Sequence, residues 1–104
     1  MNRTALFAVS ALGLIVASQV SVAGDAAAGK TKAAACVACH GMNGIGTQPL
    51  YPNLAGQKEA YIVQTLKGFR SGERTNAIMN AMAKPLSDAD IENLAAHFSS
   101  LKSQ

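Results

Sequence analysis

The segment Cys36-Val37-Ala38-Cys39-His40 constrains this chain more than any other part of it. On a helix, residues three and four apart lie on one face, so Cys36, Cys39 and His40 project from the same side. The whole sequence contains only two cysteines and two histidines, and this segment holds three of those four side chains. Cys-x-x-Cys-His is the signature of c-type haem attachment. The segment therefore predicts one haem c, bound covalently through thioethers to Cys36 and Cys39, with His40 as an axial ligand of its iron.

Three other chemistries use cysteines at this spacing. A redox-active dithiol occurs near a βαβ pattern, and the sequence shows no strand pattern. A structural zinc site needs a second pair of ligands, for which only His97 and some carboxylates remain. A simple disulfide is compatible with an oxidising compartment. It would leave His40 without a role, whereas haem attachment accounts for all three side chains.

Residues 1–23 have the three-part pattern of a secretory signal peptide. Arg3 supplies a positive charge, residues 5–16 are almost wholly apolar, and Ser21-Val22-Ala23 offers small residues at a cleavage position. The apolar run is shorter than the ~20 residues of a membrane-spanning helix, although an uncleaved anchor is an alternative. We predict cleavage after Ala23, export to the periplasm and a soluble mature chain with no stable membrane insertion.

The mature chain, residues 24–104, is long enough for one domain. A chain this short usually needs a disulfide, a metal or a cofactor to complete its core. Nine basic side chains, one of them Arg3 in the leader, stand against six acidic ones. This small excess, without a basic run interleaved with aromatic residues, argues against a nucleic acid partner.

The mature chain is expected to be all-helical. Residues 25–39 are rich in alanine and lysine, and His40-Gly41 ends that predicted helix. Residues 41–57 combine glycine, proline and asparagine, which indicates a structured loop. Apolar side chains at helical spacing predict a second helix over 58–69, and a short helix is expected over 75–82, before Pro85.

The last predicted helix has the clearest signals. Ser87 and Asp90 form a capping box at its start. One apolar stripe follows, made of Ile91, Leu94, Ala95, Phe98 and Leu101. His97 lies at the edge of that stripe, so we expect it to be solvated.

The iron face opposite His40 needs a second protein ligand if the haem is six-coordinate. Met42 follows His40 too closely to reach round the ring, and His97 is expected to be solvated, which leaves Met79 and Met82. The residue pattern alone does not choose between these two methionines. Methionine–histidine ligation raises the reduction potential, and a filled sixth position favours electron transfer over oxygen or peroxide chemistry.

Several separated segments occur here in an order known from one family. They are residues 24–30, 36–41, 51–57, 69–76, 78–79, 86–91 and 94–98. With them the chain resembles the class I cytochromes c, in particular the small bacterial c553 type and the single domains of dihaem cytochrome c4. The resemblance covers the whole of residues 24–104. It implies a small all-α fold with three to four helices around one covalently attached haem.

The resemblance also implies roles for individual residues. Met79 lies seven residues before Leu86, the place of the axial methionine in the family. Pro52 matches the proline whose carbonyl accepts a hydrogen bond from the axial histidine. His97 departs from the family pattern, which more often has an aromatic residue there.

Other residues have positions that fit either a structural or a haem-related role. Gly29 and Ala33 would let the first helix cross closely against Leu94 and Phe98. The polar residues before Met79 would approach the haem propionates or the methionine sulfur, or else are solvated or cap the short helix. They are Arg70, Arg74 and Asn76.

These observations predict a periplasmic monohaem cytochrome that carries single electrons and is not an enzyme. Its partners would be membrane or periplasmic oxidases, reductases or dehydrogenases, and it would be a monomer or a weak dimer. Two alternatives are a haem subunit of a dehydrogenase complex and a gas sensor with an open iron position. A small peroxidase would need a polar residue beside that position, and the sequence offers no strong candidate.

Overall fold

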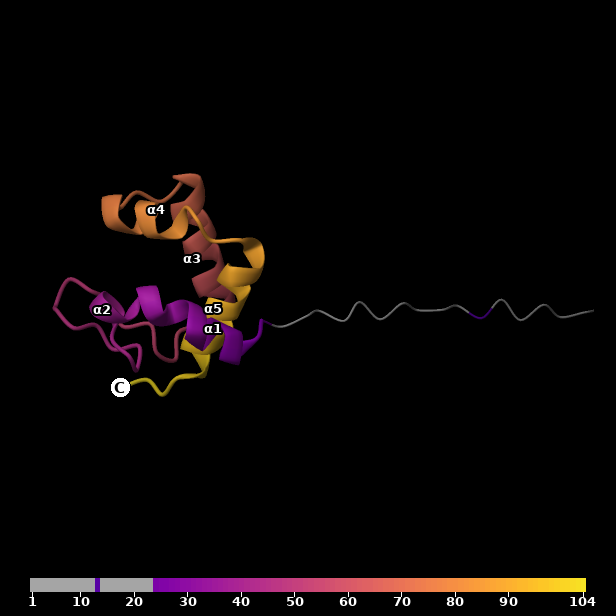
Figure 1. Ribbon diagram of the computed structural model, residues 1–104, viewed down its shortest axis with the longest axis horizontal. Helices are drawn as coiled ribbons and strands as arrows, with labels where there is room; N and C mark the ends of the chain where they lie inside the picture. Colours follow the sequence, from indigo (N-terminus) through magenta and orange to yellow (C-terminus); the bar gives the residue numbers. More distant parts are fainter. Residues whose placement is uncertain (1–12, 14–23) are drawn as a thin grey trace, which may run out of the picture.

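The computed structural model describes residues 24–104 and the single residue Gly13. The predicted signal peptide and its cleavage position therefore fall, apart from Gly13, outside the described residues. Over residues 24–104 the chain is helical and contains no strand, as predicted (Figure 1). In chain order the elements are α1 (Ala26–Lys32), the 3-10 helix η1 (Ala33–Ala35), α2 (Val37–His40), α3 (Glu59–Ser71), α4 (Ala77–Ala83) and α5 (Asp88–Ser100). No helix in this part of the chain is long and apolar enough to cross a membrane.

The prediction of one continuous helix over 25–39 is wrong. Asp25 caps α1, and its carboxylate accepts hydrogen bonds from the amides of Ala27 and Ala28 at 2.9 and 3.2 Å. The chain then tightens into η1, where the Cys36 amide donates to the Ala33 carbonyl at 2.7 Å. Alanine is compatible with either winding, so the composition of this stretch gave no signal of the change.

The bounds of α3 and α4 differ little from the predicted ranges. α3 begins one residue later than expected and continues to Ser71, where Gly72 ends it with a φ of 85°. Only glycine adopts this left-handed conformation readily, which explains why the helix stops there. α4 begins after Asn76 and ends at Ala83, two residues before Pro85.

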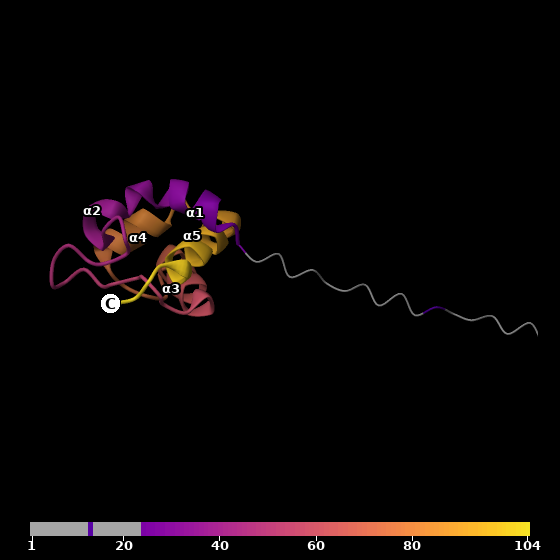
Figure 2. The same cartoon turned by 90° about the horizontal axis from the view of Figure 1, so that it is seen from below.

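α1 crosses α5 closely, and the two helices lie side by side in both views (Figures 1 and 2). A Cβ atom added to Gly29 would lie 1.9 Å from the Asn93 carbonyl oxygen, so only glycine fits at this crossing. Ala33 belongs to the core cluster together with Leu94 and Phe98. The predicted crossing is confirmed, with Asn93 and His97 as the immediate neighbours of Gly29.

α5 is the central helix of the hydrophobic core. Its capping box is present: the Ser87 hydroxyl accepts from the Asp90 amide, and the Asp90 carboxylate accepts from the Ser87 amide, both at 3.0 Å. The stripe residues Ile91, Leu94, Ala95 and Phe98 are buried. Ile62 of α3 packs into the same cluster. The core therefore lies where η1, α3 and α5 meet.

The expectation that His97 is solvated is wrong, because its exposed fraction is only 7%. A Cβ atom on Gly29 would lie 2.9 Å from the Cβ of His97, which shows how closely α1 covers this edge of α5. The His97 ring also packs against Phe98, with 5.0 Å between ring centroids. Because Gly29 has no side chain, the α1 backbone comes close enough to α5 to cover His97. The periodicity of α5 alone would leave His97 at the surface.

The burial of His97 leads to a pH-dependent stability. Burial, with a smaller contribution from the nearby Lys30 ammonium, lowers the pKa of His97. Above the ordinary histidine pKa of about 6.5 the ring is neutral in both the folded and the unfolded chain, so this group does not reduce the free energy of unfolding. Below it the unfolded chain binds a proton first, so the free energy of unfolding falls by up to ~1.4 kcal/mol per pH unit until the lowered pKa is reached.

We therefore expect a His97→Phe variant to lose less stability than the wild type between pH 7 and pH 5. Denaturant unfolding of both holoproteins at the two pH values measures the difference. Asp88 and Asp90 also have lowered pKa values, but these carboxylates titrate at lower pH. Equal losses in the two proteins would show that His97 is not the acid-sensitive group.

Candidate functional site

His40 lies at the end of a very short helix that a loop holds in place. Gly41 ends α2 with a φ of 80°, and a Cβ atom there would lie 2.1 Å from the Ile45 carbonyl oxygen. The Thr47 amide donates to the Cys39 carbonyl at 3.0 Å, which ties the loop back to the helix. The His40 side chain is buried, with 8% of its surface exposed.

The ring of His40 is oriented by a hydrogen bond to the loop. Its Nδ1 lies 2.9 Å from the Pro52 carbonyl oxygen, the contact that the resemblance predicts. A carbonyl oxygen only accepts, so Nδ1 must be the protonated nitrogen that donates. The other ring nitrogen, Nε2, then keeps its lone pair, which is the form of histidine that binds a metal.

The loop of residues 41–57 is folded so that it presents the Pro52 carbonyl. The Asn53 side chain accepts from the Gly46 amide at 2.8 Å. The Leu54 amide donates to the Gly44 carbonyl at 2.8 Å. These bonds enclose Pro52 and hold its carbonyl in position for His40.

Cys36 and Cys39 are free thiols and are partly buried. Burial raises the pKa of the Cys36 thiol, and the neighbouring Cys39 raises it further. Redox-active Cys-x-x-Cys pairs work with a lowered thiol pKa, because the thiolate is the nucleophile. The raised pKa of Cys36 is the opposite of what a redox-active thiol at this position would need.

The methionines differ in their exposure. Met42 is 82% exposed on the loop, whereas Met79 and Met82 lie three residues apart on α4. Met79 is partly buried, and Met82 is 39% exposed. Ile78, also on α4, is 60% exposed. This short helix therefore has large apolar side chains that the protein core does not cover.

This donor set fits a covalently attached haem. It provides two free thiols, an imidazole with an oriented lone pair, and thioethers on α4. The hydrophobic core is also small: among the described residues, Ile91 and Leu94 are the only large side chains with less than 2% exposure. A bulky apolar cofactor would complete such a core.

The polar residues before Met79 make contacts within the protein. Arg70 donates to the Leu86 carbonyl at 3.0 Å and to the Asp88 carboxylate at 2.6 Å. Arg74 lies over the Phe69 ring, 5.1 Å from its centroid. Asn76 caps α4, and its side-chain oxygen accepts from the Met79 amide at 3.0 Å. The structure thus brings Asn76 to the methionine segment and gives both arginines partners elsewhere.

Sequence reasoning missed Asn80, whose side chain makes three hydrogen bonds around the start of α4. One signal was available. Asparagine favours caps and turns and is a poor helix former, so an asparagine within a short helix needs an explanation.

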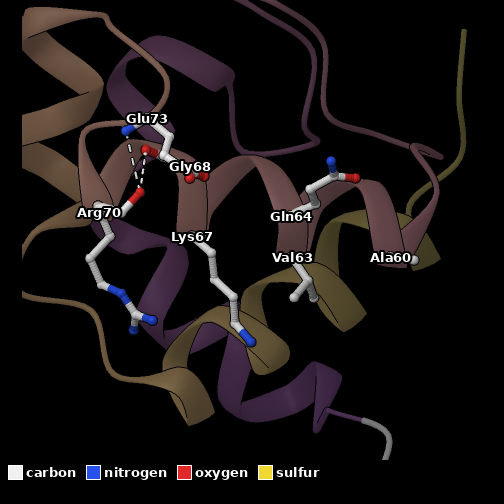
Figure 3. Close-up of a pocket in the computed structure, with 8 residues that line it drawn as sticks. Ala60, Val63, Gln64, Lys67, Gly68, Arg70 and Glu73 are labelled. Atoms are coloured by element: carbon white, nitrogen blue, oxygen red, sulfur yellow. Dashed lines mark hydrogen bonds between the residues drawn. The ribbon is translucent and has the colours of Figure 1, made fainter.

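A shallow hollow lies on the surface of α3, away from the Cys-x-x-Cys-His segment. It has a volume of about 570 Å³ and is lined by Ala60, Val63, Gln64, Lys67, Gly68, Arg70, Ser71 and Glu73. Figure 3 shows Val63, Lys67 and Arg70 extending from the same side of the helix. None of the predicted haem ligands borders this hollow. Within residues 24–104, no three His, Cys, Asp or Glu side chains gather as a metal-ion site.

Comparison with known proteins gives consistent matches. The family model described as cytochrome c matches residues 26–102. The chain is 51% identical over 81 residues to cytochrome c-554(548) of Halomonas halodenitrificans, covering 75% of this chain and 98% of that protein. It is 41% identical over 102 residues to cytochrome c4 of Pseudomonas aeruginosa, covering 98% of this chain and 50% of that protein.

A solved structure agrees with these matches. Reduced recombinant cytochrome c4 from Pseudomonas stutzeri superimposes with a TM-score of 0.73 at 44% identity, covering 77% of this chain and 47% of that one. The chain thus spans about half the length of the cytochrome c4 relatives that it matches. These relatives are electron-carrier cytochromes rather than enzymes, and their family binds haem c covalently. From its fold, its Cys-x-x-Cys-His segment and these matches, the chain belongs to the cytochrome c family.

Proposed function

We propose that residues 24–104 form a periplasmic electron carrier with one six-coordinate haem. Cys36 and Cys39 form its two thioether bonds, and His40 and Met79 are the axial ligands of the iron. The observation that carries this proposal is the hydrogen bond from His40 Nδ1 to the Pro52 carbonyl oxygen at 2.9 Å. It supports a histidine whose Nε2 is free, oriented and buried beside two free thiols.

Each of these residues has a defined task. The bound haem supplies the one-electron chemistry of its iron. The Pro52 carbonyl fixes the tautomer and the orientation of the His40 ring and makes Nε2 a stronger donor. The two cysteines, one helical turn apart, would hold the haem covalently. Pro52 thus acts through His40.

Two observations support Met79 over Met82 as the second axial ligand. Met79 is the more buried of the two, as expected for a side chain directed into the protein. Its amide is also held by the Asn76 side chain at the first turn of α4. The position of Met79 relative to Leu86 in the family pattern points the same way.

The region around the motif supports brief contacts with redox proteins through an uncharged surface. Residues 33–57 and 76–83 contain no Asp, Glu, Lys or Arg. Within that first segment Met42 and Leu50 are 82% and 91% exposed. Short-lived redox complexes bury small surfaces. The proposed partners are oxidases, reductases or dehydrogenases of the membrane or periplasm.

The proposal includes export with cleavage after Ala23. The charged start, the apolar run and the small residues at 21–23 support this. α1 is capped by Asp25, so the first helix begins directly after the proposed new terminus.

The test is the optical spectrum and the mass of the protein exported with haem-attachment machinery. We expect a sharp α band after reduction, and in the ferric form the weak long-wavelength band of an iron–methionine bond. The mass should correspond to a chain that begins at Gly24 and carries one haem. A high-spin spectrum that responds to carbon monoxide would contradict methionine ligation and favour the sensor alternative.

A further inference from the structure

We propose that Asn80 is a positioning residue for the methionine ligand: it fixes the start of α4 so that Met79 stays on the iron. This inference rests on the proposed function, because it takes Met79 as the axial ligand. It assigns to the neighbouring asparagine a role that is separate from binding the haem.

The Asn80 side chain joins three parts of the backbone. Its Nδ2 donates to the carbonyl oxygens of Phe69 and Arg74, both at 2.8 Å. Its Oδ1 accepts from the Asn76 amide at 2.9 Å. Both amide hydrogens and the oxygen of the side chain are therefore used. Through them Asn80 connects the end of α3, the turn that follows and the residue that begins α4.

A second asparagine completes this arrangement. The Asn76 side chain accepts from the Met79 amide at 3.0 Å, while the Asn76 amide donates to Asn80. The two side chains thus hold the first turn of α4 from both ends. Met79 lies inside that turn, so its backbone is fixed directly by Asn76 and indirectly by Asn80.

α4 has few other interactions that would fix its position. It has seven residues, a length at which an isolated helix is not stable in water. Its only buried residue is Ala83. α3 is the only described helix that packs extensively against it (Figure 1). With so little apolar burial, the hydrogen bonds of Asn80 are a large part of what sets the position of Met79.

The choice of residue at position 80 supports the same role. Alanine is the best helix former, and asparagine is among the poorer ones. An Asn80→Ala substitution therefore improves the intrinsic helix propensity of α4 while it removes three hydrogen bonds. A loss of methionine ligation in that variant would come from the lost contacts, since propensity acts in the opposite direction.

The experiment is a titration of the ferric holoprotein with imidazole. Imidazole binds to the iron only when the methionine has left, so its apparent affinity reports the fraction of protein without the iron–methionine bond. With the contacts of Asn80 removed, we expect Asn80→Ala to bind imidazole about tenfold more tightly than the wild type. The long-wavelength methionine band of the ferric protein should weaken in the same variant.

A second variant guards against a failure of Asn80→Ala to fold. Asn80→Asp keeps an acceptor for the Asn76 amide but has no donors for the Phe69 and Arg74 carbonyls. It should shift imidazole binding in the same direction. Unchanged imidazole affinity in both variants would overturn the proposal.

The matched control is Asn93→Ala. Asn93 lies on α5, and its side-chain oxygen accepts from the Asp25 amide at 2.8 Å, at the α1–α5 crossing. Losing this bond lowers overall stability without touching α4, so imidazole affinity should remain that of the wild type. Equal shifts in Asn93→Ala and Asn80→Ala would show a general loss of stability and overturn the positioning role.

The wild-type spectrum separates this inference from the proposed function. If the ferric wild type lacks the methionine band, the assignment of Met79 is wrong and the role of Asn80 is overturned with it. If the band is present and Asn80→Ala leaves both band and imidazole affinity unchanged, only the role of Asn80 is overturned.

Discussion

A double variant with Cys36→Ala and Cys39→Ala, freed of haem, should lose most of its helical circular dichroism at 25 °C. The hydrophobic core of residues 24–104 is a small cluster of five buried residues, two of them alanines. A single hydrophobic core in a chain of this size rarely supplies more than ~3–5 kcal/mol of net stability. When bound, the haem is the largest apolar body in the domain, so its loss removes the centre of the core.

The measurement is far-ultraviolet circular dichroism together with a thermal melt. The wild-type holoprotein should melt cooperatively, whereas the double variant should show no clear transition. Ala38→Ser, at an exposed position inside the same motif, is the control and should keep both the haem and the melt. A double variant with full helicity and an unchanged melting temperature would show that the protein core suffices without haem.

Replacing Met79 by alanine should abolish the long-wavelength band of the ferric protein and lower the reduction potential. A neutral thioether stabilises ferrous iron, so its loss favours the ferric state. Axial ligands set haem potentials over a range of about 0.8 V, and we expect a fall on the order of 0.1 V for this change. Carbon monoxide should then bind readily to the reduced protein, because the sixth position is open. Spectroelectrochemical titration measures the reduction potential, and carbon monoxide difference spectra measure whether carbon monoxide binds to the reduced iron.

Met82→Ala is the matched control, because Met82 lies on the same short helix three residues away. We expect it to keep the band and to change the potential little. The reverse result, with the band lost in Met82→Ala and kept in Met79→Ala, would assign the ligand to Met82. That outcome would also remove the basis for a positioning role of Asn80.

Local signals of the sequence predicted the local features of the structure. The capping box of Ser87 and Asp90 is present, because a cap depends only on residues three apart along the chain. The helix predicted over 58–69 is present and continues to Ser71, where Gly72 adopts the left-handed conformation that ends it. The helical class and the family could likewise be predicted from the sequence.

Predictions failed where two segments far apart in the chain meet. His97 is at the edge of the apolar stripe in a helix taken alone, and α1 covers it in the folded chain. The partners of Arg70, for which the sequence left several roles open, also come from a distant segment: its guanidinium binds Asp88 and the Leu86 carbonyl at the start of α5. The spacing of apolar residues along one helix carries no information about how helices cross, so neither contact could be predicted from it.

By itself, the sequence predicts that Cys36, Cys39 and His40 share one face of a helix end, because residues three and four apart on a helix lie on the same side. Only the tertiary structure decided how His40 is oriented, with Nδ1 directed at the Pro52 carbonyl twelve residues later. It likewise decided that the side chain of Asn80 reaches back to Phe69, eleven residues earlier. Such hydrogen bonds form only when loops and helix ends are brought together by packing, and a local pattern carries no information about that approach.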